Sequence, residues 1–73
     1  MTLPRQATGR IDTTISSVAV RGGDDRSEAA YAAWHTRQRF GREVGTILAV
    51  WRTGQRDEHG WPVFAVEWEA REG

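Results

Sequence analysis

The 73-residue chain contains no cysteine and no lysine. Without cysteine it can form neither a disulfide nor a thiolate zinc site. Its two histidines, His35 and His59, are too few to build a metal cluster, so we expect no metal and no cofactor. A domain this short often needs an extra source of stability. Association with another chain is the source that these absences leave open.

The absence of lysine means that all ten basic residues are arginine. Codon usage in a G+C-rich genome, such as that of an actinobacterium or one of its phages or plasmids, is the simplest explanation. The phosphate-binding P-loop pattern, which requires a lysine, is excluded. Gly22-Gly23, between a predicted strand and a predicted helix, is therefore interpreted as a turn, with Asp24 and Asp25 placed where they would repel phosphate.

Long apolar runs are also missing. No stretch approaches the roughly 18 consecutive apolar residues of a membrane-spanning helix, and residues 1–9 lack the apolar core of a signal peptide. We therefore expect an intracellular, cytoplasmic protein. A hydrophobic content of 38% and four tryptophans argue against a disordered chain.

The formal net charge is zero, but the charges are unevenly distributed. Residues 1–56 hold nine arginines against five acidic residues, a net charge of +4, whereas residues 57–73 hold one arginine against five acidic residues, a net charge of −4. Tight nonspecific binding to nucleic acid favours a strong positive charge. The bipolar distribution fits self-association or a protein partner better, and no membrane partner is expected.

The apolar pattern predicts a flexible arm at residues 1–9 and a single α+β domain at residues 10–73. β-Branched residues predict a strand over 11–21, and an alanine-rich segment predicts a helix over about 26–40. Two further strands are expected at 44–53 and 61–70. This β-α-β-β order gives a short, mostly antiparallel three-stranded sheet with one helix packed on one face. A small SH3-like barrel is the alternative.

The first strand changes phase along its length. Ile11 and Ile15 fall on one face, whereas Val18 and Val20 fall on the other. This pattern predicts either a bulge near Ser16–Ser17 or a central strand that is covered on both faces. In the helix, one face at 100° per residue is expected to cover the sheet, and it holds Ala30, Ala33, Trp34 and Phe40, with Tyr31 at its edge.

The last two strands flank the polar turn Asp57-Glu58-His59-Gly60, which is typical of a β-hairpin. A loop at residues 58–60 would place Val50 opposite Trp68. Since Pro62 cannot donate a hydrogen bond, the last strand is expected to have a free edge near its start. Alternation then predicts a core face with Leu48, Val50, Phe64, Val66 and Trp68.

The opposite face of the hairpin is apolar as well, and one helix cannot cover both faces. Apolar patches ringed by charge are typical of interfaces. We therefore expect a non-catalytic interaction module that binds a second copy of the chain or another protein. Its size and composition fit a small regulator, adaptor or virion component of a phage or other mobile element. The predicted partner-binding residues are Trp51, Trp61, Val63, Ile47 and Glu67.

Three alternatives to this interpretation remain. The arm or a curled first strand could cover the outer face. Arginines could form a nucleic-acid-binding patch from the helix end and the hairpin, namely Arg37, Arg39, Arg42, Arg52 and Arg56. Glu67 and Glu69 share one side of a strand, and paired carboxylates can transfer protons. No nucleophile lies near them in the sequence, so we expect a solvated strand face and no enzyme.

Overall fold

A helix and a curved sheet form the two layers of the structure. The computed structural model describes residues 6–21 and 25–71, and of residues 25–27 only the backbone. In chain order the elements are β1 (Thr14–Ala19), α1 (Asp25–Phe40), a 3-10 turn (Gly41–Glu43), β2 (Val44–Arg56) and β3 (Pro62–Ala70).

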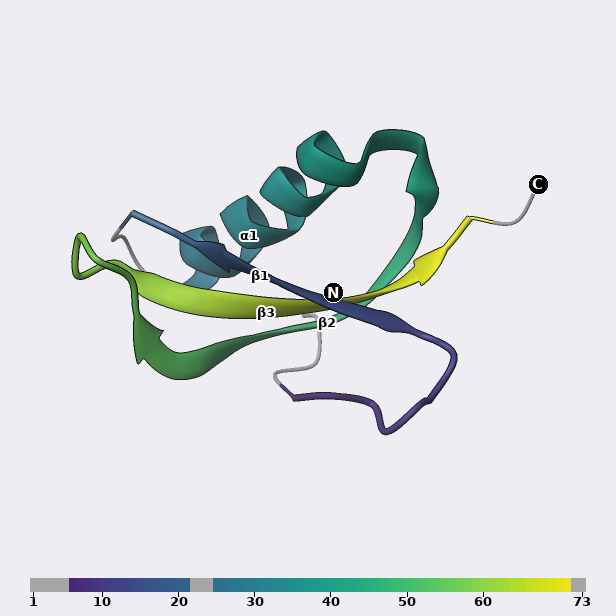
Figure 1. Ribbon diagram of the computed structural model, residues 1–73, viewed down its shortest axis with the longest axis horizontal. Coiled ribbons are helices and arrows are strands. Elements are labelled where there is room, and N and C mark those ends of the chain that lie inside the picture. The colour runs from purple at the N-terminus through teal and green to yellow at the C-terminus, as the bar shows by residue number, and fades with distance from the viewer. Residues whose placement is uncertain (1–5, 22–24, 72–73) are drawn as a thin grey trace.

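The three strands are antiparallel and lie in the order β1-β3-β2, with α1 packed on one face of the sheet (Figure 1). The predicted α+β fold is confirmed. The sheet is open, so it is not the closed barrel of the alternative. The turn predicted at Gly22-Gly23, with Asp24, lies outside the described residues.

β1 is shorter than predicted and regular over its six described pairs with β3. The predicted bulge near Ser16–Ser17 is wrong, and so is a central position for this strand. Ile11 lies outside the strand and is fully exposed, which removes the conflict of phase. Within β1, Ile15 is exposed on one face, whereas Val18 packs against the core on the other.

β3 is the central strand, although it begins with proline. The N–H of Val20 donates to the carbonyl of Pro62 at 3.0 Å, so the start of β3 is paired through its oxygen. The predicted free edge at this point is wrong. A proline is tolerated here because it is the first residue of the strand.

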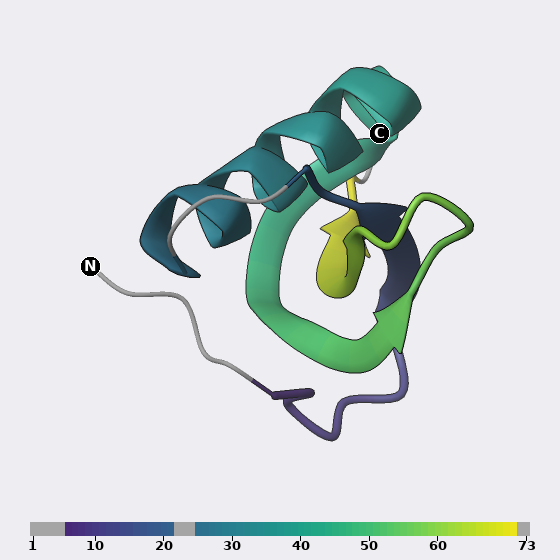
Figure 2. The same ribbon diagram turned by 90° about the vertical axis from the view of Figure 1, so that its left-hand side faces the viewer.

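β2 is irregular, and its pairing with β3 shifts register at three places. Bulges bend a strand and increase its twist, and β2 curves around β3 accordingly (Figure 2). The predicted pairing of Val50 with Trp68 is wrong, because Val50 lies opposite Val66 and Ile47 lies opposite Trp68.

One of these irregularities exchanges the faces of two apolar residues. Between Ile47 and Ala49 the alternation is interrupted. As a result Ile47 belongs to the core and is 8% exposed, whereas Leu48 is only half-buried. The predicted places of Leu48 on the core face and Ile47 on the outer face are therefore both wrong.

The core lies between α1 and the facing side of the sheet. Phe40 packs on Trp68 with ring centroids 5.1 Å apart. The indole N–H of Trp68 donates to Oγ of Ser16 at 3.2 Å, so the buried ring keeps a polar partner. The buried cluster comprises Val20, Ala32, Val44, Ile47, Val50, Phe64, Val66 and Trp68.

The helix contacts the sheet through a face that is rotated from the predicted one: Ala33 and Phe40 pack against the core as predicted, but Ala30 and Trp34 do not. Trp34 is 53% exposed, and Ala30 is exposed as well. The sheet-facing stripe follows the spacing of one helix face and consists of Ala29, Ala32, Ala33, Thr36 and Phe40. Thr36 can be buried because its hydroxyl donates to the carbonyl of Ala32 at 2.9 Å. These small side chains, and not the indole, form the contact.

Candidate interaction surfaces

Glu67 was expected on an exposed face, but it is 1% exposed and lies beneath the segment that precedes β1. The backbone N–H of Thr8 donates to Oε1 at 2.8 Å, and the Thr8 hydroxyl donates to Oε2 at 3.0 Å. The hydroxyl of Thr13 also donates to Oε2, at 2.7 Å. These hydrogen bonds, that of Thr13 first, hold the pKa of Glu67 below its ordinary value of 4.5.

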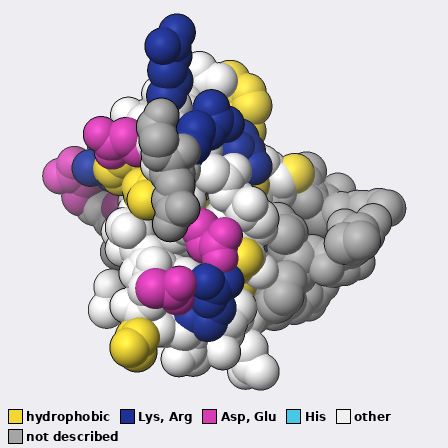
Figure 3. Space-filling view, turned by 90° about the vertical axis from the view of Figure 1, so that its right-hand side faces the viewer, with side chains coloured by type: hydrophobic (Ala, Val, Ile, Leu, Met, Phe, Trp, Pro, Cys, Tyr) yellow, Lys and Arg dark blue, Asp and Glu magenta, His cyan; other side chains and the backbone are white. Residues whose placement is uncertain are grey.

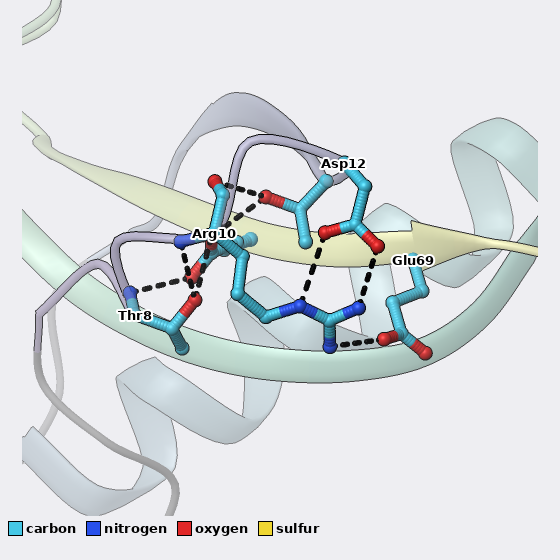
Figure 4. Close-up of polar contacts among 6 residues, drawn as sticks. Thr8, Arg10, Asp12 and Glu69 are labelled. Atoms are coloured by element: carbon cyan, nitrogen blue, oxygen red, sulfur yellow. Dashed lines mark hydrogen bonds and ion pairs between the residues drawn. The ribbon is translucent and has the colours of Figure 1, made fainter.

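The same segment binds Glu69 through a different residue (Figure 4). Arg10 forms an ion pair with Glu69 and a two-bond contact with Asp12, Nε to Oδ1 at 3.0 Å and Nη2 to Oδ2 at 2.7 Å. The guanidinium lowers the pKa of Asp12, and the two carboxylates raise the pKa of Arg10. Acidic and basic side chains consequently lie side by side at this end of the molecule (Figure 3).

These contacts decide how the outer face is covered. Residues 8–13 close the Glu67 end, from the side of the sheet opposite α1 (Figure 1). The alternative in which the arm covers this face is thus correct for this end. Thr8, within the predicted flexible arm, is held in place by Glu67. Glu67 accepts hydrogen bonds from Thr8 and Thr13, whereas Glu69 pairs with Arg10. Both carboxylates thus hold the segment before β1 against the sheet.

Several apolar side chains nevertheless stay at the surface. Ile15 lies opposite Glu67 and is 54% exposed, and Trp61, just before β3, is 37% exposed, while Ala19, Trp51 and Val63 are half-buried. We call these five residues the outer strip. Within it Ala19 lies opposite Val63, whereas Trp51 lies opposite Ala65 and Ile15 stands apart beside Glu67. Of the predicted partner-binding residues, Trp51, Trp61 and Val63 therefore remain accessible, whereas Ile47 and Glu67 do not.

The hairpin tip fixes the orientation of Trp61. Its backbone N–H donates to Oδ1 of Asp57 at 2.8 Å, and the same oxygen accepts the N–H of His59 at 3.0 Å. The rings of His59 and Trp61 lie 5.2 Å apart. The backbone of Trp61 is therefore held by the turn, and its indole lies against the ring of His59.

The five predicted arginines do not form one patch. The C-terminal end of α1, with Arg37, Arg39 and Arg42, lies at the opposite end of the molecule from the hairpin loop (Figure 1). Arg52 is bound to Glu28 and lies over the ring of Phe64. Arg56 donates to the carbonyl of Gly60 at 2.7 Å. The hairpin arginines therefore have structural contacts of their own.

An aromatic cluster on α1 was not predicted. Tyr31 is 45% exposed and Trp34 is 53% exposed. Their ring centroids lie 5.8 Å apart, and each ring also contacts His35, at 5.0 and 5.6 Å. Their i, i+3 and i+4 spacing was visible in the sequence. The cluster was missed because Trp34, as the largest apolar residue of the helix, was assigned to the core.

The described residues offer little to a metal ion or a small molecule. No group of three or more histidine or acidic side chains is placed to hold a metal within residues 6–21 and 25–71. A depression beside the hairpin is open to solvent and is lined by Arg52, Gly54, Gln55, Arg56, Pro62 and Val63. No helix in the described part of the chain is long and apolar enough to cross a membrane.

No protein-family model matches the chain, and comparisons with curated proteins and with solved structures gave no match. The proposals that follow therefore depend on the residues and geometry described above.

Proposed function

We propose that this protein is a non-catalytic interaction module that associates with a second copy of itself through the outer strip. The observation that carries the proposal is the exposure of Ile15 on the edge strand and of Trp61 before β3, on a protein whose Trp51 and Val63 are only half-buried. Soluble monomers rarely leave large contiguous apolar patches exposed, and those that do often use them for binding.

The composition of the strip fits an interface. Tryptophan is enriched at the centre of interfaces, where it supplies a large contact area. Fully burying a side chain the size of isoleucine is worth about 1.5–3 kcal/mol, and roughly half of that is still available at Ile15. The formal net charge of zero means that two copies do not repel each other strongly.

The test is the molar mass in solution as a function of concentration, measured by light scattering on a size-exclusion column. We expect the mass of the unmodified protein to rise towards that of a dimer. Ile15→Ala should weaken association by roughly tenfold, the value of a modest interface contact. Trp34→Ala is the matched control, because Trp34 is exposed to a similar degree on a different surface.

Two results would count against this function. A protein that stays monomeric at about 1 mM does not self-associate. A Trp34→Ala variant that weakens association more than Ile15→Ala would move the interface to α1. Circular dichroism of each variant checks that the helix is still folded.

A second candidate function is single-stranded nucleic-acid binding by α1, and the aromatic cluster favours it. From Ala29 to Arg42 the chain has three arginines and no acidic residue. Exposed rings beside arginines are the combination that stacks on bases and attracts phosphates. This candidate uses Arg37, Arg39 and Arg42, without the distant hairpin arginines.

Fluorescence anisotropy of a labelled oligothymidine tests this second function. Binding should weaken steeply as salt rises, and Trp34→Ala should reduce affinity by about tenfold, at the lower end of a stacking contact. Trp61→Ala serves as the control and should leave the affinity unchanged. Absence of binding at low salt would exclude this function.

A further inference from the structure

β1 presents one edge that no strand pairs with among residues 6–21 and 25–71. Val20 donates its N–H to Pro62 of β3. Along an antiparallel pair of strands, every second residue directs its backbone N–H and C=O towards the partner strand. Thr14, Ser16 and Val18 therefore form their backbone hydrogen bonds with β3, as Val20 does. The N–H and C=O groups of the intervening residues, Ile15, Ser17 and Ala19, therefore point away from β3 towards the free edge.

This edge lacks the features that usually prevent strand addition. Natural sheets protect their edges with charges, prolines or bulges. β1 has the sequence TISSVA, which contains no charge and no proline, and its six described pairs with β3 run without a shift. The other edge strand, β2, is irregular at three places and carries Arg52 and Arg56. The two edges of the sheet thus differ in how open they are to another strand.

We propose that two copies of the chain pair antiparallel through their β1 edges, about a two-fold axis at Ser17. This geometry rests on the proposed self-association and confines the contact to the β1 part of the outer strip, Ile15 and Ala19, with Trp51, Trp61 and Val63 outside it. Residues equally distant from the axis face each other, so Ile15 of each copy lies opposite Ala19 of the other, and Ser17 lies opposite Ser17. The outward backbone groups of all three residues then find partners.

The side chains of this arrangement are complementary. On the outer face the large side chain of Ile15 lies next to the small side chain of Ala19 from the second copy. At the axis the small side chains of the two Ser17 residues lie next to each other. Ala19 lies opposite Val63 in its own protomer. Ile15 of the second copy therefore extends the row formed by Ala19 and Val63, and the exposed part of its side chain is covered. The joined sheet has six strands and a continuous outer strip.

Because each copy contributes one short strand, we expect a weak dimer with a micromolar or higher Kd. Ser17→Pro removes the outward N–H of Ser17 and leaves the bonds to β3 intact, so the protomer should fold. In the dimer this substitution deletes two symmetry-related hydrogen bonds, and Kd should rise by about 30-fold. Ser17→Ala keeps the N–H and is the matched control, with an unchanged Kd.

A charge exchange tests the two-fold axis directly. Ser17→Arg and Ser17→Glu each place like charges opposite each other, so each variant alone should be monomeric. An equimolar mixture places Arg opposite Glu and should restore the dimer. Restoration requires that residue 17 of one copy faces residue 17 of the other, which an interface elsewhere on the protein does not provide.

Amide hydrogen exchange of the full chain gives an independent measurement. In the dimer the amides of Ile15, Ser17 and Ala19 should be protected, and in Ser17→Pro the remaining two should exchange rapidly while Ser16 and Val18 stay protected. A protein that dimerises but is insensitive to substitution at Ser17 overturns the β1 interface and leaves self-association standing. A protein that is monomeric at about 1 mM overturns both.

Discussion

The hydroxyl of Thr13 donates a hydrogen bond of 2.7 Å to Oε2 of Glu67, which lies fifty-four residues later in the chain. This bond ties the segment before β1 to the central strand. Together with the two bonds from Thr8, it gives the buried carboxylate three donors. A buried charge is tolerated only when it is satisfied in this way, so the segment and the carboxylate stabilise each other.

The first prediction concerns pH. The pKa of Glu67 is lower in the folded protein than its ordinary value of 4.5. Its stabilising contribution is therefore complete above that value and is lost as the pH falls through the folded pKa. The lowered pKa of Asp12 acts in the same direction. Urea unfolding from about pH 7 to about pH 3 should show stability decreasing with acid.

Glu67→Gln isolates the contribution of Glu67. The variant should be less stable at neutral pH, because the amide replaces a charged acceptor of three donors, and its stability should depend less on pH. Glu58→Gln is the control, since the Glu58 side chain is 89% exposed in the hairpin loop. If Glu67→Gln and the unmodified protein lost stability equally in acid, the three hydrogen bonds would not be holding the carboxylate.

The second prediction separates the observed register of β2 from the one expected from the sequence. Ile47→Ala should destabilise the protein by about 2–5 kcal/mol, because it removes a buried core side chain. Leu48→Ala should cost less, because Leu48 is half-buried. Urea denaturation of the two variants gives the comparison. If Leu48→Ala destabilised the protein more than Ile47→Ala, Leu48 would lie in the core and β2 would follow the register without the bulge.

The elements of the fold were predictable because their periodicity is local. The alanines of α1, the glycine-containing hairpin turn and the β-branched residues of β2 and β3 each indicate one type of element. The bulge at Ile47 has no such local indication. It depends on how far β2 must curve to follow β3, which is a property of the whole sheet, and alternation alone assigned Ile47 and Leu48 to the wrong faces.

The candidate surfaces were predictable only in part, for a related reason. Trp51, Trp61 and Val63 were assigned to the outer face by parity; Trp51 and Val63 pair with residues of that face, and Trp61 is partly exposed just before β3. The position of Glu67 depends on Thr8 and Thr13, residues with no recognisable motif. In α1, Thr36 is buried because its hydroxyl is satisfied within the helix, and a polar residue at that position gave no sign in the sequence that it faces the core.

The third prediction concerns Gly45, where β2 passes close to the end of β3. A Cβ at this position would lie 3.0 Å from the carbonyl oxygen of Glu69 and 3.4 Å from Cα of Arg71. Both contacts are with backbone, which cannot rotate away. Gly45→Ala should therefore destabilise the protein by about 1–3 kcal/mol in urea unfolding. Thr46→Ala, at the neighbouring exposed position, should change stability by less than about 1 kcal/mol.

The fourth prediction concerns the ion pair between Glu28 of α1 and Arg52 of β2. It joins the helix to the sheet, and the carboxylate is 3% exposed whereas the Arg52 side chain is 47% exposed. Arg52→Ala should cost about 1–2 kcal/mol, the lower part of the range for charged hydrogen bonds, because solvent reaches the guanidinium. Packing against Phe64 is lost as well.

A double-mutant cycle with Glu28→Gln and Arg52→Ala separates the ion pair from the packing. The coupling measured in urea should be about 1 kcal/mol, and Arg42→Ala, at the exposed end of α1, should show no coupling to Glu28→Gln. A coupling near zero would contradict this prediction, because it would mean that Arg52 stabilises the protein through its packing on Phe64 and not through the ion pair with Glu28.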